Sequence, residues 1–246
     1  MWRVAILVRK LTDIPMEKFE SRWRGAIAPA IADAAARAGS VARVVLNIPP
    51  AHLGDDLRSV FPPAYDGLLE LWFTTPEGAE ATMRAIADDG TAAKLARPVI
   101  DAERSVTWLA LAFPTKPEDG STVKFLAGGE VAEGVELEEA QAYWRDVHPV
   151  VAQTAPQVWE PLTRYTQFHG KPDHVLASID WLAKGRFVPL CSDMGFARTD
   201  DFLGVYSSEQ YSRIVRPDEE KFSRPGEMLS YISGEERVLI EAETPG

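Results

Sequence analysis

Polar side chains on one predicted helix and on the strand that follows it could carry acid–base chemistry. In "WRDVHP", His148 comes four residues after Trp144, so a helix places the two side chains about 40° apart on one face. Tyr165, Gln167 and His169 alternate in "RYTQFH", so a strand places all three on one side of its sheet. A histidine with a pKa of about 6.5 can accept or donate a proton near neutral pH. We therefore predict that His148 moves a proton, that Tyr165 stabilises negative charge and that Gln167 orients a carboxylate or carbonyl group.

The two halves of the chain share one sequence pattern. Residues 3–48 align with residues 124–169 without a gap, and a few aligned residues are identical. Among the identical pairs are Glu17/Glu138, Trp23/Trp144, Arg24/Arg145 and Arg43/Arg164. The alignment indicates a duplication in which both copies keep one arrangement of elements.

The second copy replaces apolar residues of the first copy with polar residues and glycines. The aligned pairs are Ile27/His148, Val44/Tyr165, Leu46/Gln167, Ile48/His169, Leu7/Gly128 and Val8/Gly129. A buried polar group without a partner costs about 1–3 kcal/mol. We therefore predict that these residues of the second copy line a cavity that holds a polar ligand. The alternative is that the polar groups hydrogen-bond one another and fill a second core.

Three further side chains near His148 are candidates for the site. His169 is a catalytic candidate, although its place at the end of the strand also allows it to be exposed. Trp144 shares the helix face of His148 and is predicted to contact the substrate. Arg145 is predicted to bind substrate as a carboxylate anchor, or to form a structural ion pair, because both copies keep this arginine.

The elements that must position these residues follow the order β-α-β-β-α-β in each half. In the first half we predict strands at 3–10, 41–48, 65–75 and 104–113, and helices over 14–39 and 75–88. In the second half we predict strands at 122–130, 162–170, 201–208 and 236–243, and helices over 136–155 and 209–222. This order is that of a ferredoxin-like unit, whose sheet has helices on one face only. Two such sheets can hide their bare faces against each other.

The boundary between the two units falls in "PTKPEDGS", residues 114–121, which is rich in proline and charge. We predict a mainly structural domain at 1–113 and a domain at 122–246 that carries the site. Between 170 and 199 the second domain has a longer connection, with a short helix predicted over 172–185. This insertion is either a lid, with Trp181 and Phe187 contacting the substrate, or a segment that packs on the outside or at a dimer interface.

The composition excludes several classes of function. The formal net charge of −11 argues against nucleic acids and anionic membranes as partners. A single cysteine, Cys191, permits neither an internal disulfide nor a thiolate metal cluster. We expect no membrane span, because no run of 18 apolar residues occurs, and a cytoplasmic location, because no signal peptide is recognisable. The sequence also lacks the spacing of a helical metal site and of a dinucleotide-binding loop, so we predict no metal.

The motifs "WRDVHP", "RYTQFH" and, in the first half, "YDGLLELWF" resemble those of the EthD-like branch of the dimeric α/β-barrel superfamily. The first copy departs from the family pattern, with Ile27 in place of the histidine, and in the second copy Pro149 comes one residue early. The resemblance covers both halves and implies an α+β fold in which two ferredoxin-like domains form the barrel within one chain. The resemblance also implies a function that acts on small molecules without a metal or organic cofactor. Relatives are decarboxylases, dehydratases, cyclases and cofactor-free oxygenases of aromatic or polyketide compounds.

Together, these observations predict a cofactor-independent lyase. It would act on a small aromatic, phenolic or polyketide-like acid by decarboxylation or a related elimination, with His148 as the general acid or base. Decarboxylation is favoured by the family resemblance alone. The alternatives are a non-catalytic protein that binds the same kind of small molecule, and a cofactor-free cyclase, dehydratase or monooxygenase. A homodimer is possible, because further association is common in such folds.

Overall fold

The structure of the protein is a computed structural model that describes residues 1–50, 64–117, 120–174, 176 and 178–242. The elements of the first half are β1 (Trp2–Lys10), α1 (Met16–Arg22), the π-helix η1 (Trp23–Ile27), α2 (Ala28–Ala38), β2 (Val41–Ile48), β3 (Gly67–Phe73), α4 (Pro76–Asp89), α5 (Thr91–Ala96) and β4 (Ile100–Lys116). Local sequence signals fix several of these boundaries. The Thr75 hydroxyl accepts a hydrogen bond from the Gly78 amide at 3.1 Å and caps α4, while Gly39, at a φ of 77°, ends α2.

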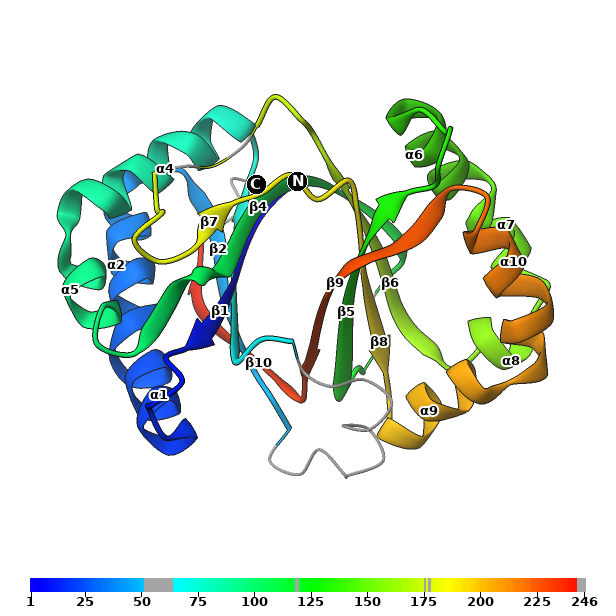
Figure 1. Ribbon diagram of the computed structural model, residues 1–246, viewed down its shortest axis with the longest axis horizontal. Coiled ribbons are helices and arrows are strands. Elements are labelled where there is room, and N and C mark those ends of the chain that lie inside the picture. Colours follow the sequence, from blue (N-terminus) through cyan, green and yellow to red (C-terminus); the bar gives the residue numbers. More distant parts are fainter. Residues whose placement is uncertain (51–63, 118–119, 175, 177, 243–246) are drawn as a thin grey trace.

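The second half repeats the order of elements with changes around its site. Its elements are β5 (Val123–Val131), α6 (Leu137–Asp146), α7 (His148–Gln153), α8 (Pro156–Trp159), β6 (Leu162–Gly170), β7 (Lys184–Gly185), β8 (Leu190–Phe196), α9 (Thr199–Ser207), the π-helix η2 (Tyr211–Val215), α10 (Arg216–Glu219), β9 (Ser223–Ser233) and β10 (Glu235–Glu241). Figure 1 shows the helices of the two halves on opposite outer sides, with the strands between them.

The prediction of a strand at 201–208 is wrong, because this segment belongs to helix α9. Its apolar residues Phe202 and Val205 are three apart and both buried, which is a helical spacing that a short apolar run does not separate from a strand. The third strand of the second half is instead β8. Its strand character is hidden in the sequence because Asp193, which is buried among cations, interrupts the apolar pattern.

The helix predicted over 172–185 is also absent from the described residues of that segment, where residues 178–182 form turns. Residues 175 and 177 lie outside the described part. The apolar side chains of Leu176, Ile179 and Leu182 are buried in the hydrophobic core of the first half. The insertion therefore packs on the first half of the chain, and β7 adds a short parallel pairing to β4.

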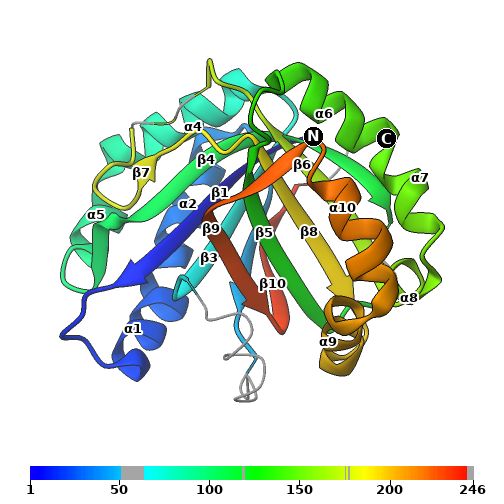
Figure 2. The ribbon, with the colours of Figure 1, turned by 45° about the vertical axis from the view of Figure 1, so that its right-hand side comes forward.

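Two long strands join the halves into one barrel. The strands follow the order β10-β2-β3-β1-β4-β6-β8-β5-β9. β4 pairs with β1 and then with β6, so it continues to Lys116 through the first residues of the predicted linker. At the other end, β9 pairs with β5 and β10 pairs with β2, with only Gly234 between them (Figure 2). A Cβ atom at Gly234 would lie 2.9 Å from the Pro50 backbone, so only glycine allows this close passage. The predicted fold, α+β with two ferredoxin-like units packed sheet to sheet, is confirmed.

The space between the two sheets is filled by apolar side chains around a buried network of ion pairs. Glu70 of β3 binds Arg3 at 2.7 Å and Lys124 of β5 at 2.6 Å. The network also includes Asp193, Glu236 and Arg164. The Arg3 guanidinium lies 3.2 Å from the centre of the Phe168 ring. Residues from both halves thus neutralise one another in the interior, which buried charges require.

Candidate active site

The second half encloses a cavity of about 440 Å³ between its sheet and its outer helices. Strands β5, β6 and β8 form one wall, and α6, α7, α8, α9, η2 and α10 form the others. Aromatic rings from six of these elements line it: Phe125, Trp144, Trp159, Tyr165, Tyr206 and Tyr211. In the first half, the corresponding layer is a continuous apolar core that includes Trp23 and Ile27. The two halves therefore differ at the place where their sequences differ.

Gly129 helps to open the cavity at strand β5, whereas a Cβ atom at Gly128 would point at Leu229 and Val188, which do not line the cavity. Gly128 and Gly129 are among its lining residues, and Val8, which aligns with Gly129, is fully buried in the core of the first half. A Cβ atom added at Gly129 would meet only the Arg224 carbonyl oxygen, at 3.4 Å. A side chain at residue 129 would thus take up space that the cavity now has.

A break between two helices presents His148 to the cavity. Helix α6 ends at Asp146 and α7 begins at His148, one residue before Pro149. Proline cannot donate a backbone hydrogen bond, and its ring clashes with the carbonyl of the fourth preceding residue, so the helix is interrupted here. The Gln167 side chain donates to the Trp144 carbonyl at 2.7 Å and ties the helix end to strand β6.

His148 and Asp218 form a buried dyad at the cavity wall. The Nδ1 atom of His148 lies 2.8 Å from the Asp218 carboxylate. Burial lowers the pKa of His148 below its ordinary value, so the ring is neutral at pH 7. Burial acts to raise the pKa of Asp218, but hydrogen bonds from Tyr143, His148 and Lys221 bring it below the ordinary value. An ionised Asp218 accepts a hydrogen bond from the protonated Nδ1 atom of His148. In this tautomer Nε2 carries no proton, so its lone pair is available to a ligand.

Tyr165 lines the same cavity beside Trp144. The Trp144 indole donates to the Tyr165 hydroxyl oxygen at 2.8 Å. Burial raises the pKa of Tyr165 well above its ordinary value, so the phenol stays protonated. With its oxygen already accepting a hydrogen bond, the Tyr165 hydroxyl can donate its proton to an oxygen atom of a ligand.

Gln167 and His169 lie behind the cavity wall and are not among the lining residues. His169 lies at the end of its strand but is only 1% exposed, so it is buried and not on the surface. The rings of Phe113 and Trp144 cover it, with centroids at 4.4 Å and 5.1 Å. Burial, together with the nearby cation of Arg145, lowers the pKa of His169 to about 3. His169 therefore stays neutral and contacts the Gln167 amide oxygen at 3.2 Å.

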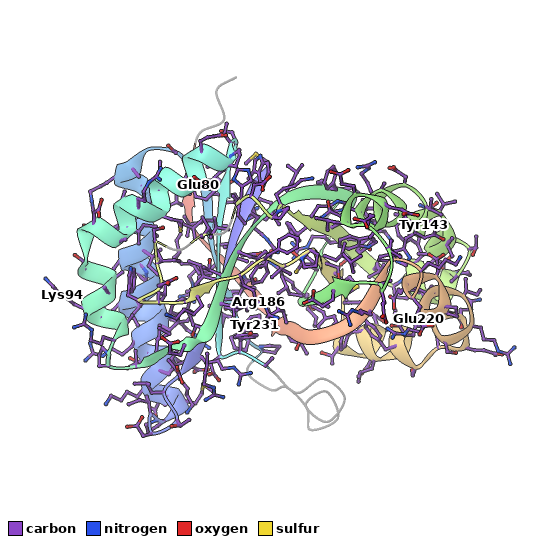
Figure 3. The ribbon with its side chains drawn as sticks, turned by 45° about the horizontal axis from the view of Figure 1, so that its top comes forward. Glu80, Lys94, Tyr143, Arg186, Glu220 and Tyr231 are labelled. Carbon is purple, nitrogen blue, oxygen red and sulfur yellow. The ribbon has the colours of Figure 1, made fainter. Side chains whose placement is uncertain are left out.

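Arg145, Trp181 and Phe187, which the sequence places among the substrate-binding candidates, are also outside the cavity lining. Arg145 is exposed and pairs with the adjacent Asp146 carboxylate at 2.6 Å. Trp181 packs against the core of the first half. Figure 3 places Arg186, the neighbour of Phe187, near the middle of the molecule, away from Tyr143 and Glu220 on the helices of the second half.

A second polar cluster faces the cavity from η2 and α10. Tyr211 donates to Oε2 of Glu219 at 3.1 Å, and Arg216 contacts the same oxygen at 3.4 Å. All three residues line the cavity. Burial raises the pKa of Glu219 to about 7, although Tyr211 and Arg216 act to lower it. The cavity thus holds two acid–base groups, His148 and Glu219.

The sequence-based reasoning did not single out Asp218 or Glu219. A signal was present, because Tyr211, Val215 and Phe222 continue at helical spacing through this segment, and both acids lie on or beside that apolar seam. From the sequence alone, acidic residues at the end of a helix are equally consistent with a solvated helix terminus and with a functional site.

Two observations bear on metals and membranes. Within residues 1–50, 64–117, 120–174, 176 and 178–242, no cluster of three histidine, cysteine or acidic side chains could hold a metal ion. Among the same residues, no helix is both long and apolar enough to cross a membrane.

Comparison with solved structures shows the same fold in proteins of very different sequence. An anthrone oxidase-like protein superposes with a TM-score of 0.62 at 10% identity, over 99% of this chain and 96% of that chain. A putative chlorite dismutase gives a TM-score of 0.55 at 8% identity, over 95% and 93%. A mutant chlorite dismutase from Candidatus Nitrospira defluvii gives 0.52 at 10% identity, over 94% and 90%. At these identities, the likeness shows the fold alone.

At the level of sequence, no curated protein matches the chain. The model of the EthD domain matches residues 132–226, which begin just after β5 and end within β9. This range includes every polar residue of the cavity described above, and it confirms the resemblance drawn from "WRDVHP" and "RYTQFH". Residues 132–226 are therefore similar in sequence to the EthD domain, within a chain that shares its fold with these solved structures.

Proposed function

We propose that the protein is a cofactor-independent lyase that acts on a small aromatic, phenolic or polyketide-like acid. The observation that carries the proposal is the buried His148–Asp218 dyad, at 2.8 Å, on the wall of an aromatic cavity. A neutral histidine whose second nitrogen is held by a carboxylate is the arrangement of a general base.

The cavity suits an aromatic ligand with few polar groups. Its volume of about 440 Å³ falls in the range of small-molecule sites, which are mostly apolar with a few polar groups that fix orientation. The rings of Trp144, Trp159 and Phe222 offer flat contact surfaces. Arg216 and Arg224 are cations among the lining residues and support binding of the carboxylate of an acid.

In this proposal each residue has a separate part in proton transfer. Nε2 of His148 accepts a proton from the substrate, and the Asp218 carboxylate stabilises the imidazolium that forms. The Tyr165 hydroxyl donates a hydrogen bond to the oxygen atom on which negative charge develops. Gln167 acts indirectly, because it holds the helix end from which His148 projects.

The neighbour described as anthrone oxidase-like favours one alternative, the oxygenation of a phenolic aromatic compound. Such a reaction would use the same base to form an aromatic anion that then reacts with dioxygen. Oxygen uptake separates this alternative from a lyase, because decarboxylation and dehydration consume no dioxygen.

The proposal can be tested with two probes that give one fluorescent product. 1-Hydroxy-2-naphthoic acid yields 1-naphthol by loss of carbon dioxide, and 3-hydroxy-1-tetralone yields 1-naphthol by loss of water. We expect the protein to form 1-naphthol from at least one probe without oxygen uptake. His148→Gln should lower the rate by about 100-fold or more while probe binding is retained.

His174→Gln is the matched control, because His174 contacts Glu80 of the first half at 3.0 Å and does not line the cavity. This variant should keep the full rate. Binding of both probes without any 1-naphthol would overturn the lyase proposal and support a binding protein instead. Consumption of a probe with oxygen uptake and without formation of 1-naphthol would support the oxygenase alternative.

A further inference from the structure

We propose that Glu219 is a second acid–base group of the cavity, which donates a proton to a leaving hydroxyl group, and that the reaction of this site is dehydration. This inference rests on the proposed lyase function and specifies its reaction. It assigns a role to a side chain that the His148–Asp218 dyad does not use.

The position of Glu219 carries the inference. Asp218 and Glu219 are adjacent on α10, and the first holds His148 while the second lines the cavity with Tyr211 and Arg216. Both hydrogen bonds to Glu219 reach Oε2. Its Oε1 atom therefore has no hydrogen-bond partner within the described part of the chain and is available to a ligand.

The surroundings of Glu219 favour a carboxyl group that can hold a proton. Tyr211 and Arg216 contact it directly, and Asp218 acts on it as a like charge. Glu219 in turn acts electrostatically on Tyr165 of β6 and Tyr206 of α9. The other charged or titratable groups among the described lining residues are His148, Cys191 and Arg224. Because burial raises the pKa of Glu219 to about 7, a substantial fraction of the side chain is protonated at neutral pH.

A base and an acid that face one cavity match the needs of β-elimination. Nε2 of His148 takes the proton from the carbon atom next to a carbonyl group, and the electron pair of that C–H bond forms a C=C bond. The C–O bond at the neighbouring carbon breaks, and the leaving hydroxyl takes the Glu219 proton and departs as water. The imidazolium then releases its proton to solvent, and the carboxylate regains one. The net change is the loss of one water molecule.

Decarboxylation would use this pair less well. Loss of carbon dioxide leaves an electron pair on carbon that needs only an acid, so His148 would have no proton to accept from carbon. The structure therefore favours dehydration of a β-hydroxy carbonyl compound on an aromatic or partly reduced ring skeleton.

The test compares Glu219→Gln with Glu220→Gln. Glu220 is the next residue and also binds Arg216, at 3.2 Å, but it is exposed and outside the cavity lining. With 3-hydroxy-1-tetralone as the probe, Glu219→Gln should lower the rate of 1-naphthol formation by about 100-fold or more with the probe still bound. Glu220→Gln should change the rate less than about twofold.

A pH profile gives a readout that a purely structural role would not move. The wild-type rate should fall as the pH rises above about 7, because Glu219 must be protonated to act. The residual rate of Glu219→Gln should lack this alkaline decline.

The outcomes separate this inference from the proposed function. If His148→Gln abolishes turnover but Glu219→Gln keeps the wild-type rate, the lyase stands and the role of Glu219 is overturned. If 1-hydroxy-2-naphthoic acid is consumed and 3-hydroxy-1-tetralone is not, the lyase stands and dehydration is overturned. If neither probe gives 1-naphthol, the lyase proposal itself fails.

Discussion

The buried ion pairs between the two sheets lead to a quantitative prediction for Glu70→Gln. The Glu70 carboxylate accepts hydrogen bonds from Arg3 at 2.7 Å, from Lys124 at 2.6 Å and from Asn47 at 3.0 Å. A glutamine of the same shape removes the negative charge and turns a donor toward at least one cation. Arg3 or Lys124 would then be buried without a full counter-charge, which is the costly way to break such a network.

The magnitude follows from the pKa of Glu70. Burial acts to raise this pKa, but Lys124 and Arg3 outweigh it and lower the pKa from 4.5 to about 2. A difference of one pKa unit corresponds to about 1.4 kcal/mol, so ionised Glu70 contributes about 3 kcal/mol to the free energy of unfolding. Because the folded-state pKa is depressed, this contribution is complete above the unfolded pKa of 4.5 and is lost as the pH falls toward 2.

Urea denaturation at two pH values measures this contribution. Glu70→Gln should lower the free energy of unfolding by about 3 kcal/mol at pH 7 and by about 1 kcal/mol at pH 3. Glu80→Gln, at a partly exposed position on α4 (Figure 3), should cost less than about 1 kcal/mol at pH 7. A loss below about 1 kcal/mol for Glu70→Gln at pH 7, or an equal loss at both pH values, would refute the reasoning.

Three further predictions concern the cavity. Gly129→Val restores the side chain that the first half has and should abolish binding of 2-naphthol in a calorimetric titration; unchanged affinity would show that this glycine does not open the cavity. Ionised Glu219 destabilises the fold increasingly as the pH rises from 4.5 through 7, because its folded-state pKa is raised. The gain in the free energy of unfolding on Glu219→Gln should therefore be about 1–3 kcal/mol larger at pH 8 than at pH 5. Equal shifts of the urea midpoint at both pH values would contradict this prediction. Gln167→Leu leaves the Trp144 carbonyl without its side-chain donor and should lower the free energy of unfolding by about 1–3 kcal/mol; a loss under 0.5 kcal/mol, about the size of a surface substitution, would argue against the tie between helix and strand.

Much of the first half of the chain follows from local sequence patterns. Apolar residues at helical spacing, the Thr75 cap and the alternating strands predict its elements, because each signal lies within a few residues of the element that it marks. The second half was harder to predict. Asp193 hides strand β8, and the apolar residues of α9 fit a strand as well as a helix. In both cases burial by distant elements decided between local alternatives.

Taken alone, the sequence determined the duplication and the position at which the copies diverge, because aligned residues keep the same face of a helix or strand. It thereby pointed to His148 and Tyr165. Only the tertiary structure brought Asp218 to His148, since the two are 70 residues apart, and only it placed His169 behind the Trp144 ring. Periodicity fixes the face on which a side chain lies. What that face meets depends on contacts between segments far apart in the chain, and those contacts decide which polar residues reach the cavity.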